Sequence, residues 1–60
     1  MTIEEVRNSI GEIVWHIGLG KVKIGEFDES TGYVKLSNPN DPSQFFFENQ
    51  DNLQRLELIK

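Results

Sequence analysis

The sequence predicts a small, mainly β domain: a five-stranded barrel preceded by a short α-helix. Apolar and polar residues alternate over several short runs, glycines and turn-forming clusters separate these runs, and a helical pattern occurs at the N-terminus. We expect a single domain over residues 1–60, with a helix over 2–9 and strands over about 12–17, 21–27, 32–37, 44–48 and 55–59.

Length and composition limit what this domain can be. A chain of 60 residues buries only about 60% of the surface that it exposes when unfolded, which leaves one small core. The absence of Cys excludes disulfides and thiolate metal sites. The N-terminus lacks the basic start and apolar run of a signal peptide, and no segment approaches the roughly 20 apolar residues of a membrane span. We therefore expect a cytoplasmic domain with no cofactor, no metal and no membrane contact.

The charge balance is acidic. Ten acidic and six basic residues give a formal net charge of −4, spread along the chain without a long acidic run. A protein that binds DNA without sequence specificity gains its affinity by neutralising many phosphates, and this balance disfavours that class.

The N-terminal helix is predicted from a capping box and an apolar stripe. Thr2 followed by Glu5 matches the box, and Ile3, Val6 and Ile10 recur at helical spacing. Because so short a helix is unstable alone, we expect these three apolar residues to pack on the rest of the domain.

The first strand has two apolar faces. If the alternation is regular, Ile13, Trp15 and Ile17 share one face, and Val14 and His16 share the other. The pattern alone does not say which face is buried.

Glycines mark the next turns and a bend. Gly18 and Gly20 are expected to provide the positive φ angles of a tight hairpin turn. Gly25 lies where the alternation changes phase and predicts a bulge. Asp28 is expected to cap the following turn through its carboxylate, and Gly32 to leave that turn in the left-handed region.

The C-terminal half repeats this alternation of turns and strands. Residues 38–43 contain two prolines and are expected to form the longest exposed loop, outside any strand. Three consecutive Phe, 45–47, must place rings on both faces of the fourth strand, although most aromatic rings of the chain are expected in the core. A helical or 3₁₀ turn anchored by Leu53 precedes the last strand, in which Leu56 and Leu58 are expected to face inward. Five strands with a turn before the last describe an SH3-like barrel.

Two segments carry a resemblance to a known family. Gly11-Glu12-Ile13-Val14-Trp15-His16 and Gly18-Leu19-Gly20-Lys21-Val22 resemble the pattern that opens the Tudor-like (SH3-like) domain at the C-terminus of UvrD/PcrA-type DNA-repair helicases and, more loosely, the CarD-type RNA-polymerase-interacting domain. Phe45-Phe46-Phe47 followed by Leu53 and Leu56 is similar to the family's last elements. The turn is shorter here, since only Ile17 separates His16 from Gly18. The resemblance implies a module that contacts RNA polymerase or a DNA-repair factor.

A second architecture stays open. Ile24-Gly25-Glu26-Phe27-Asp28 with Val34-Lys35-Leu36 loosely resembles the first motif of Sm-like barrels, which also begin with a helix. Their RNA-contacting signature is not found in the last strands, and the net charge disfavours RNA binding.

Candidate chemistry is sparse. His16 is the single histidine and the obvious candidate for a general base or a pH switch, but no nucleophile stands at a recognisable spacing from it, so a strand histidine packed near the turn is the better interpretation. The acidic pairs Glu4-Glu5, Asp28-Glu29 and Glu48 with Asp51 do not have the spacing of a cation-binding loop, and we expect them in caps and turns.

The sequence therefore predicts a non-enzymatic protein-interaction module. Exposed aromatic residues and a stripe of lysines are the expected contacts, because aromatic residues are enriched at interfaces. A nucleic-acid-binding barrel and a small acidic inhibitor of a nucleic-acid enzyme are the alternatives, and homo-oligomerisation is left open. The candidate partner-binding residues are Trp15, His16, Lys21, Lys23, Tyr33, Lys35, Phe45 and Phe47.

Overall fold

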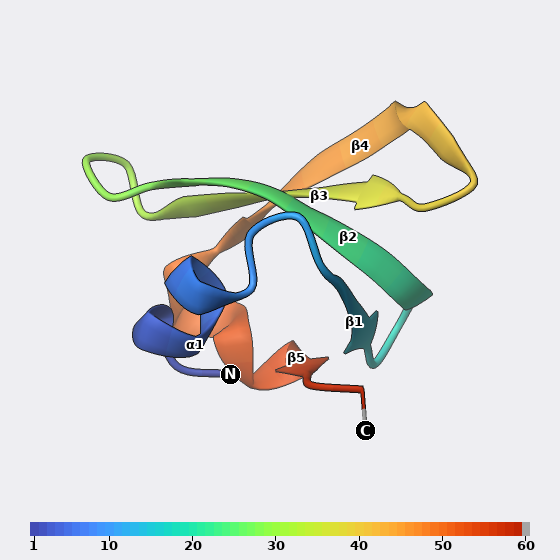
Figure 1. Cartoon of the computed structure of the whole chain (residues 1–60). Coiled ribbons are helices and arrows are strands. Elements are labelled where there is room, and N and C mark those ends of the chain that lie inside the picture. The colour runs from blue at the N-terminus through green and yellow to red at the C-terminus, as the bar shows by residue number, and fades with distance from the viewer. Residues whose placement is uncertain (60) are drawn as a thin grey trace.

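The computed structural model describes residues 1–59. In chain order its elements are α1 (Ile3–Asn8), β1 (Ile13–His16), β2 (Gly20–Asp28), β3 (Tyr33–Asn38), β4 (Asp41–Asn49), the 3₁₀ helix η1 (Gln50–Arg55) and β5 (Leu56–Glu57). The strands form one antiparallel, strongly bent sheet in the order β4-β3-β2-β1-β5 (Figure 1). The mainly β class, the five strands and the N-terminal helix are confirmed. Closure into a barrel is not, because β4 and β5 remain the two edges of an open sheet.

The predicted capping box begins α1. The Thr2 hydroxyl accepts a hydrogen bond from the Glu5 amide at 3.2 Å, and the Glu5 carboxylate accepts one from the Thr2 amide at 2.9 Å. The expectation that three apolar residues pack on the domain is wrong for two of them. Val6 is fully buried, whereas Ile3 and Ile10 are exposed. The helix has only 6 residues, so Ile10 lies beyond its end and one side chain suffices to dock it.

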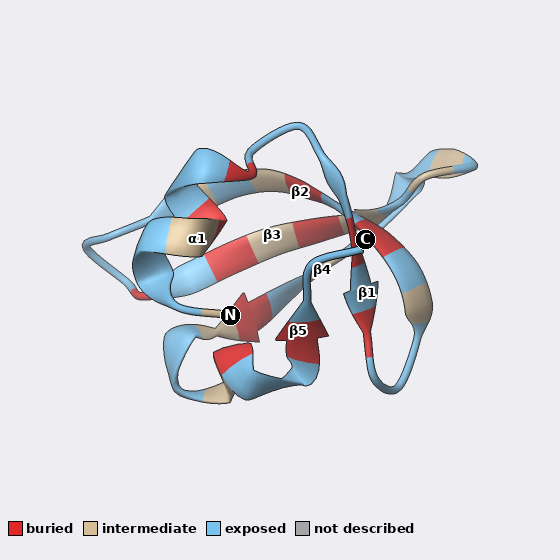
Figure 2. Cartoon of the chain, turned by 60° about the horizontal axis from the view of Figure 1, so that its bottom comes forward, coloured by how far each residue is buried: buried red, intermediate tan, exposed pale blue. Residues whose placement is uncertain are grey.

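The core is aliphatic and lies on the inner face of the sheet. Buried positions alternate along the strands (Figure 2) and comprise Val14, Val22, Ile24, Val34 and Leu36, joined by Val6, Leu53 and Leu56 from the other elements. Phe27 and Phe46 pack against this cluster and are only partly buried. The expectation that most aromatic rings fill the core is therefore wrong.

The glycines of the first hairpin and of the bend follow the predictions in part. Gly20 has the expected positive φ of 85°, but Gly18 does not adopt a positive φ. A register shift between Ile24 and Glu26 confirms the predicted bulge at Gly25.

The β2–β3 turn has the predicted chemistry. The Asp28 carboxylate accepts hydrogen bonds from the Ser30 amide at 2.9 Å and the Ser30 hydroxyl at 2.6 Å, and Gly32 leaves the turn with φ at 77°. These bonds, led by the one from the hydroxyl, lower the pKa of Asp28 below its ordinary value.

The expected loop over residues 38–43 is largely strand. β4 begins at Asp41 and contains Pro42, so the prediction that this segment lies outside any strand is wrong. β4 is an edge strand, where a residue without an amide hydrogen costs no ladder bond on the outer side. A register shift between Ser37 and Asn38 also leaves extra residues on β4 at this point.

The C-terminal elements meet the N-terminus of the chain. Leu53 anchors η1 as predicted and Leu56 faces inward, but β5 ends at Glu57 and Leu58 is exposed, contrary to expectation. The α-ammonium group of Met1 donates hydrogen bonds to the carbonyl oxygens of Leu53 at 2.7 Å and Leu56 at 2.8 Å. These contacts hold α1 beside η1 and β5.

Candidate protein-binding face

The outer face of the sheet carries seven of the eight predicted binding residues. Strand register decides this placement: Trp15 on β1 lies opposite Lys21 on β2, and Lys35 on β3 lies opposite Phe47 on β4. Each of these residues alternates with a buried neighbour, so its side chain points away from the core. We use the name outer face for Ile13, Trp15, Lys21, Lys23, Tyr33, Lys35, Phe45 and Phe47.

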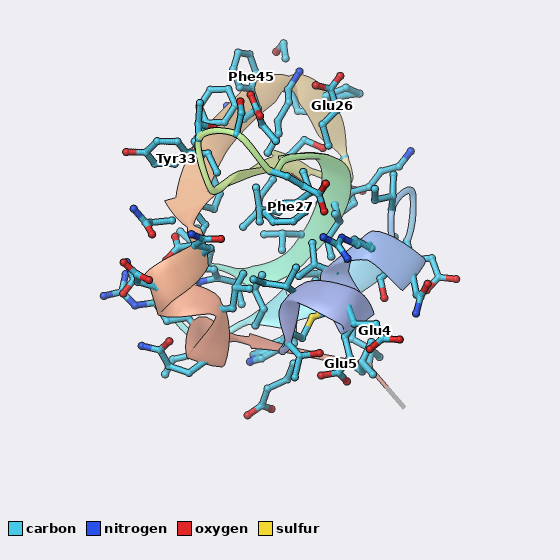
Figure 3. All side chains as sticks on the ribbon, turned by 90° about the vertical axis from the view of Figure 1, so that its left-hand side faces the viewer. Glu4, Glu5, Glu26, Phe27, Tyr33 and Phe45 are labelled. Carbon is cyan, nitrogen blue, oxygen red and sulfur yellow. The ribbon has the colours of Figure 1, made fainter. Side chains whose placement is uncertain are left out.

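Aromatic rings on β3 and β4 form a cluster in this face. Phe45 and Phe47 meet edge to face with ring centroids 5.9 Å apart, and Tyr33 meets Phe47 in the same way at 6.5 Å. The Lys35 ammonium lies 4.5 Å from the centroid of the Phe45 ring. Figure 3 shows Tyr33 and Phe45 pointing outward, whereas Phe27 points into the interior.

The rings of this cluster remain accessible despite these contacts. Tyr33 is 44% exposed, Phe45 51% and Phe47 58%, and Trp15 on β1 is 45% exposed. Aromatic side chains carry large apolar areas, so leaving four of them half in water forgoes a substantial hydrophobic gain within the folded chain.

A groove separates the two hairpins that build the outer face. Ile13, Trp15, Leu19 and Lys21 line it from the β1–β2 side, and Phe45 lines it from β4. Polar side chains near the β3–β4 turn also line it, namely Asn38, Asn40, Ser43 and Gln44, and the rest of the lining is apolar: Val22, Pro39 and Phe46. Ile13, Leu19 and these polar residues were not among the residues predicted to bind a partner, although Ile13 lies on the same face of β1 as Trp15.

The lysines of the outer face form no close ion pair in the part of the chain that the structure describes. Arg7 pairs with Glu29, and Arg55 pairs with Glu48 at 3.4 Å. Among the residues that the structure describes, none of Lys21, Lys23 and Lys35 forms an ion pair with a carboxylate. Glu26 lies directly opposite Lys35 in the β2–β3 ladder, whereas Lys21 lies opposite Trp15, and Lys23 lies opposite Ile13 and Ser37. Two cations of this face, Lys21 and Lys23, therefore have no acidic residue opposite them.

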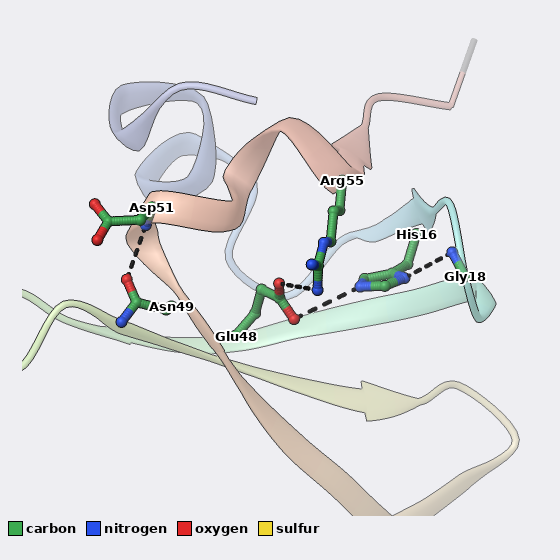
Figure 4. A network of polar contacts seen from close by, with 6 residues as sticks. All are labelled: His16, Gly18, Glu48, Asn49, Asp51 and Arg55. Carbon is green, nitrogen blue, oxygen red and sulfur yellow. Dashed lines mark hydrogen bonds and ion pairs between the residues drawn. The ribbon is translucent and has the colours of Figure 1, made fainter.

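His16 does not lie on this face. It is buried at the end of β1, and its Nδ1 accepts a hydrogen bond from the Gly18 amide at 3.1 Å (Figure 4). Its Nε2 lies 3.6 Å from a Glu48 carboxylate oxygen and has no hydrogen-bond partner within residues 1–59. The other Glu48 oxygen faces Arg55, so this group joins β1, β4 and η1. The geometry matches a histidine packed near the turn.

The acidic pairs serve local structure. Glu5 belongs to the capping box, whose bonds, led by that with the Thr2 amide, lower its pKa. Asp28 caps a turn, and Glu29 pairs with Arg7. No group of three His, Asp or Glu side chains suited to a metal ion occurs in the described part of the chain.

No helix in residues 1–59 is long and apolar enough to cross a membrane. Comparison of this chain with protein-family models, curated proteins and solved structures gave no match.

Proposed function

We propose that this chain is a non-enzymatic protein-interaction module of the SH3-like class, and that it binds its partner through the outer face. The observation that carries the proposal is the half exposure of Trp15, Tyr33, Phe45 and Phe47 on one side of one sheet. Exposed apolar patches rimmed by polar residues are typical of interaction sites in small soluble proteins.

The rigidity of this surface also supports the proposal. Trp15, Tyr33 and Phe47 each stand next to a buried residue, and Phe45 stands next to the partly buried Phe46. The buried neighbours are Val14, Val34 and Glu48. A preformed surface loses little conformational entropy on binding, and large aromatic side chains are frequent anchors of affinity.

The element order supports the SH3-like class: four strands joined by short turns, then a 3₁₀ turn and a short last strand. A cytoplasmic location and an association with RNA polymerase or DNA-repair factors stay predictions, the latter from the resemblance of residues 11–22.

A capture experiment with matched variants tests the proposal. The immobilised chain, a Tyr33→Thr/Phe47→Thr variant and an Ile10→Thr control are each incubated with extract from the native host. Threonine suits an exposed strand position, and Ile10 is 50% exposed but lies in the segment between α1 and β1, outside the strands that carry the outer face.

We expect the wild-type chain and the Ile10 control to retain the same protein, and the double variant to lose it while its circular dichroism remains that of a folded β domain. Retention of that protein by the folded double variant would contradict the proposal, as would a wild-type chain that retains no protein above background.

A further inference from the structure

We infer that the groove between the two hairpins binds an acidic, extended segment of the partner protein, with an apolar side chain seated between Trp15 and Phe45. This inference rests on the proposed function and adds the chemistry of the ligand. It follows from the lining of the groove and from the charges around it.

The apolar part of the site is formed by opposite walls. Trp15 and Leu19 belong to the β1–β2 hairpin, Phe45 belongs to β4, and all three line the same groove. Each is between 45% and 59% exposed. An apolar side chain inserted between these walls would remove surface from water on both sides, which is how an anchor residue gains affinity.

The polar lining suits a peptide backbone. Asn38 donates a hydrogen bond to Gln44 Oε1 at 3.3 Å and accepts one from the Asn40 backbone amide at 2.9 Å, so it is largely engaged within the turn. The Asn40 side-chain amide and the Gln44 Nε2 form no hydrogen bond within residues 1–59, and they bring donors and an acceptor to the β3–β4 side of the groove. An extended segment presents its own N–H and C=O groups along its length, whereas a helix has already used them internally. The lining therefore favours an extended ligand over a helical one.

The positive charge at the groove favours an acidic ligand. Lys21 is the charged residue of the groove lining, and Lys23 follows it two residues later on the same face of β2. Neither forms an ion pair with a carboxylate among residues 1–59, and the residues opposite them, Trp15, Ile13 and Ser37, are uncharged. Acidic side chains on either side of an apolar anchor would reach these ammonium groups, and a basic ligand would be repelled.

A protein segment fits this site better than a single-stranded nucleic acid does. Lys21 is the charged residue of the groove lining, whereas a single-stranded nucleic acid carries a phosphate at every nucleotide. Three lysines would also neutralise few phosphates on a chain of net charge −4.

Selection from a phage-displayed library of random heptapeptides tests the inference. The peptides enriched on the wild-type chain are synthesised and titrated, with the fluorescence of Trp15 as the readout. Trp15 is the single tryptophan of the chain and forms one wall of the groove, so a bound peptide should change its emission.

Two variants with the same change of net charge separate local from general electrostatics. Lys21→Gln removes one positive charge in the groove, and Gln54→Glu adds one negative charge on the exposed surface of η1. We expect Lys21→Gln to weaken the binding of the selected peptides by about fivefold and Gln54→Glu to change it by less than about twofold, with both effects reduced at high salt.

The expected result is enrichment of peptides in which Asp or Glu flanks a large apolar residue. Enrichment of neutral or basic peptides, no enrichment, equal effects of the two variants, or tighter quenching of Trp15 by oligothymidylate would each overturn the inference. Loss of the captured partner in the Tyr33/Phe47 variant would still support the proposed function in those cases, because those two residues do not line the groove.

Discussion

The inner and outer faces of the sheet consist of alternate residues of the same strands, and they carry different kinds of apolar side chain. On the inner face, Val14, Val22, Ile24, Val34 and Leu36 are no more than 3% exposed. On the outer face, Trp15, Tyr33, Phe45 and Phe47 are about half exposed and share the surface with lysines. Four of the six aromatic residues are thus left half in water, whereas Phe27 and Phe46 pack against the core.

This difference suggests that the inner face stabilises the fold and that the outer face is available for the proposed binding. Branched aliphatic residues suffice to fill the small interior, because α1 and η1 add only Val6 and Leu53 to it. The four aromatic residues of the outer face are then not needed to complete the core, and their exposure supports the proposed contact outside the chain. Inner-face substitutions should act on stability, and outer-face substitutions on binding.

The largest effect should come from a cavity in the inner face. Leu36→Ala removes most of a fully buried side chain and should lower the free energy of unfolding by about 2–5 kcal/mol, which threatens the fold of a 60-residue domain. Phe47→Ala on the neighbouring strand should cost less than about 1 kcal/mol, since that ring is 58% exposed. Urea unfolding followed by circular dichroism measures both, and similar losses would contradict the division between the faces.

An intermediate effect is expected from a substitution of Glu48, a buried polar residue on the inner face. Glu48 is buried between His16 and Arg55, and Glu48→Gln keeps its size while removing its charge. The free energy of unfolding should fall by about 1–3 kcal/mol, because Arg55 loses the charged acceptor of its 3.4 Å hydrogen bond.

Glu26→Gln is the matched control for this change, since Glu26 is exposed on β2. It should alter the free energy of unfolding by no more than about 0.5 kcal/mol. If both substitutions had the same small effect, the Glu48 contacts would not contribute to stability.

A smaller effect is expected from the contact between Lys35 and Phe45 on the outer face. Lys35→Met retains an unbranched apolar stem over the Phe45 ring and removes the ammonium group. A double-mutant cycle with Phe45→Leu should give a coupling free energy of about 0.5–1 kcal/mol, the range for an exposed cation and an aromatic ring. A coupling of zero would mean that Lys35 is held in place by something other than this ring.

The smallest effect is a pH dependence at the edge of the outer face. The pKa of Asp28 is lowered from 3.8 by its bonds with Ser30, so its contribution to stability is present above about pH 4 and is lost as the pH falls through the lowered value. Asp28→Asn should therefore make the free energy of unfolding depend slightly less on pH in the acidic range. Urea midpoints measured on both sides of pH 4 test this, and an unchanged pH profile would exclude the contribution.

The strands and turns could be predicted because their signals are local. Alternation and turn residues located β1, β2 and β3 within about two residues, and the bulge at Gly25 followed from a change of phase. The start of β4 could not be predicted, because Pro42 is compatible with a strand only at a sheet edge, and edge position depends on the whole topology.

Local sequence patterns also could not predict which face of β1 is buried. Hydrophobicity alone favours burying Trp15 over Val14, yet Val14 pairs with Val22 and Trp15 pairs with Lys21. Because Lys21 and Lys23 alternate with Val22 and Ile24, the polarity of β2 decides which face of β1 is exposed. The candidate residues were therefore identified by type, but the outer face that unites them required the strand register.

The most direct test of this account combines stability and partner capture in a single variant of the outer face. Trp15→Thr/Phe45→Thr/Phe47→Thr removes three exposed rings and keeps residues that suit strands. We predict a folded domain that loses less free energy of unfolding than Leu36→Ala does and no longer retains the partner. An unfolded triple variant, or a folded one that still retains the partner, would contradict the assignment of folding to the inner face and binding to the outer face.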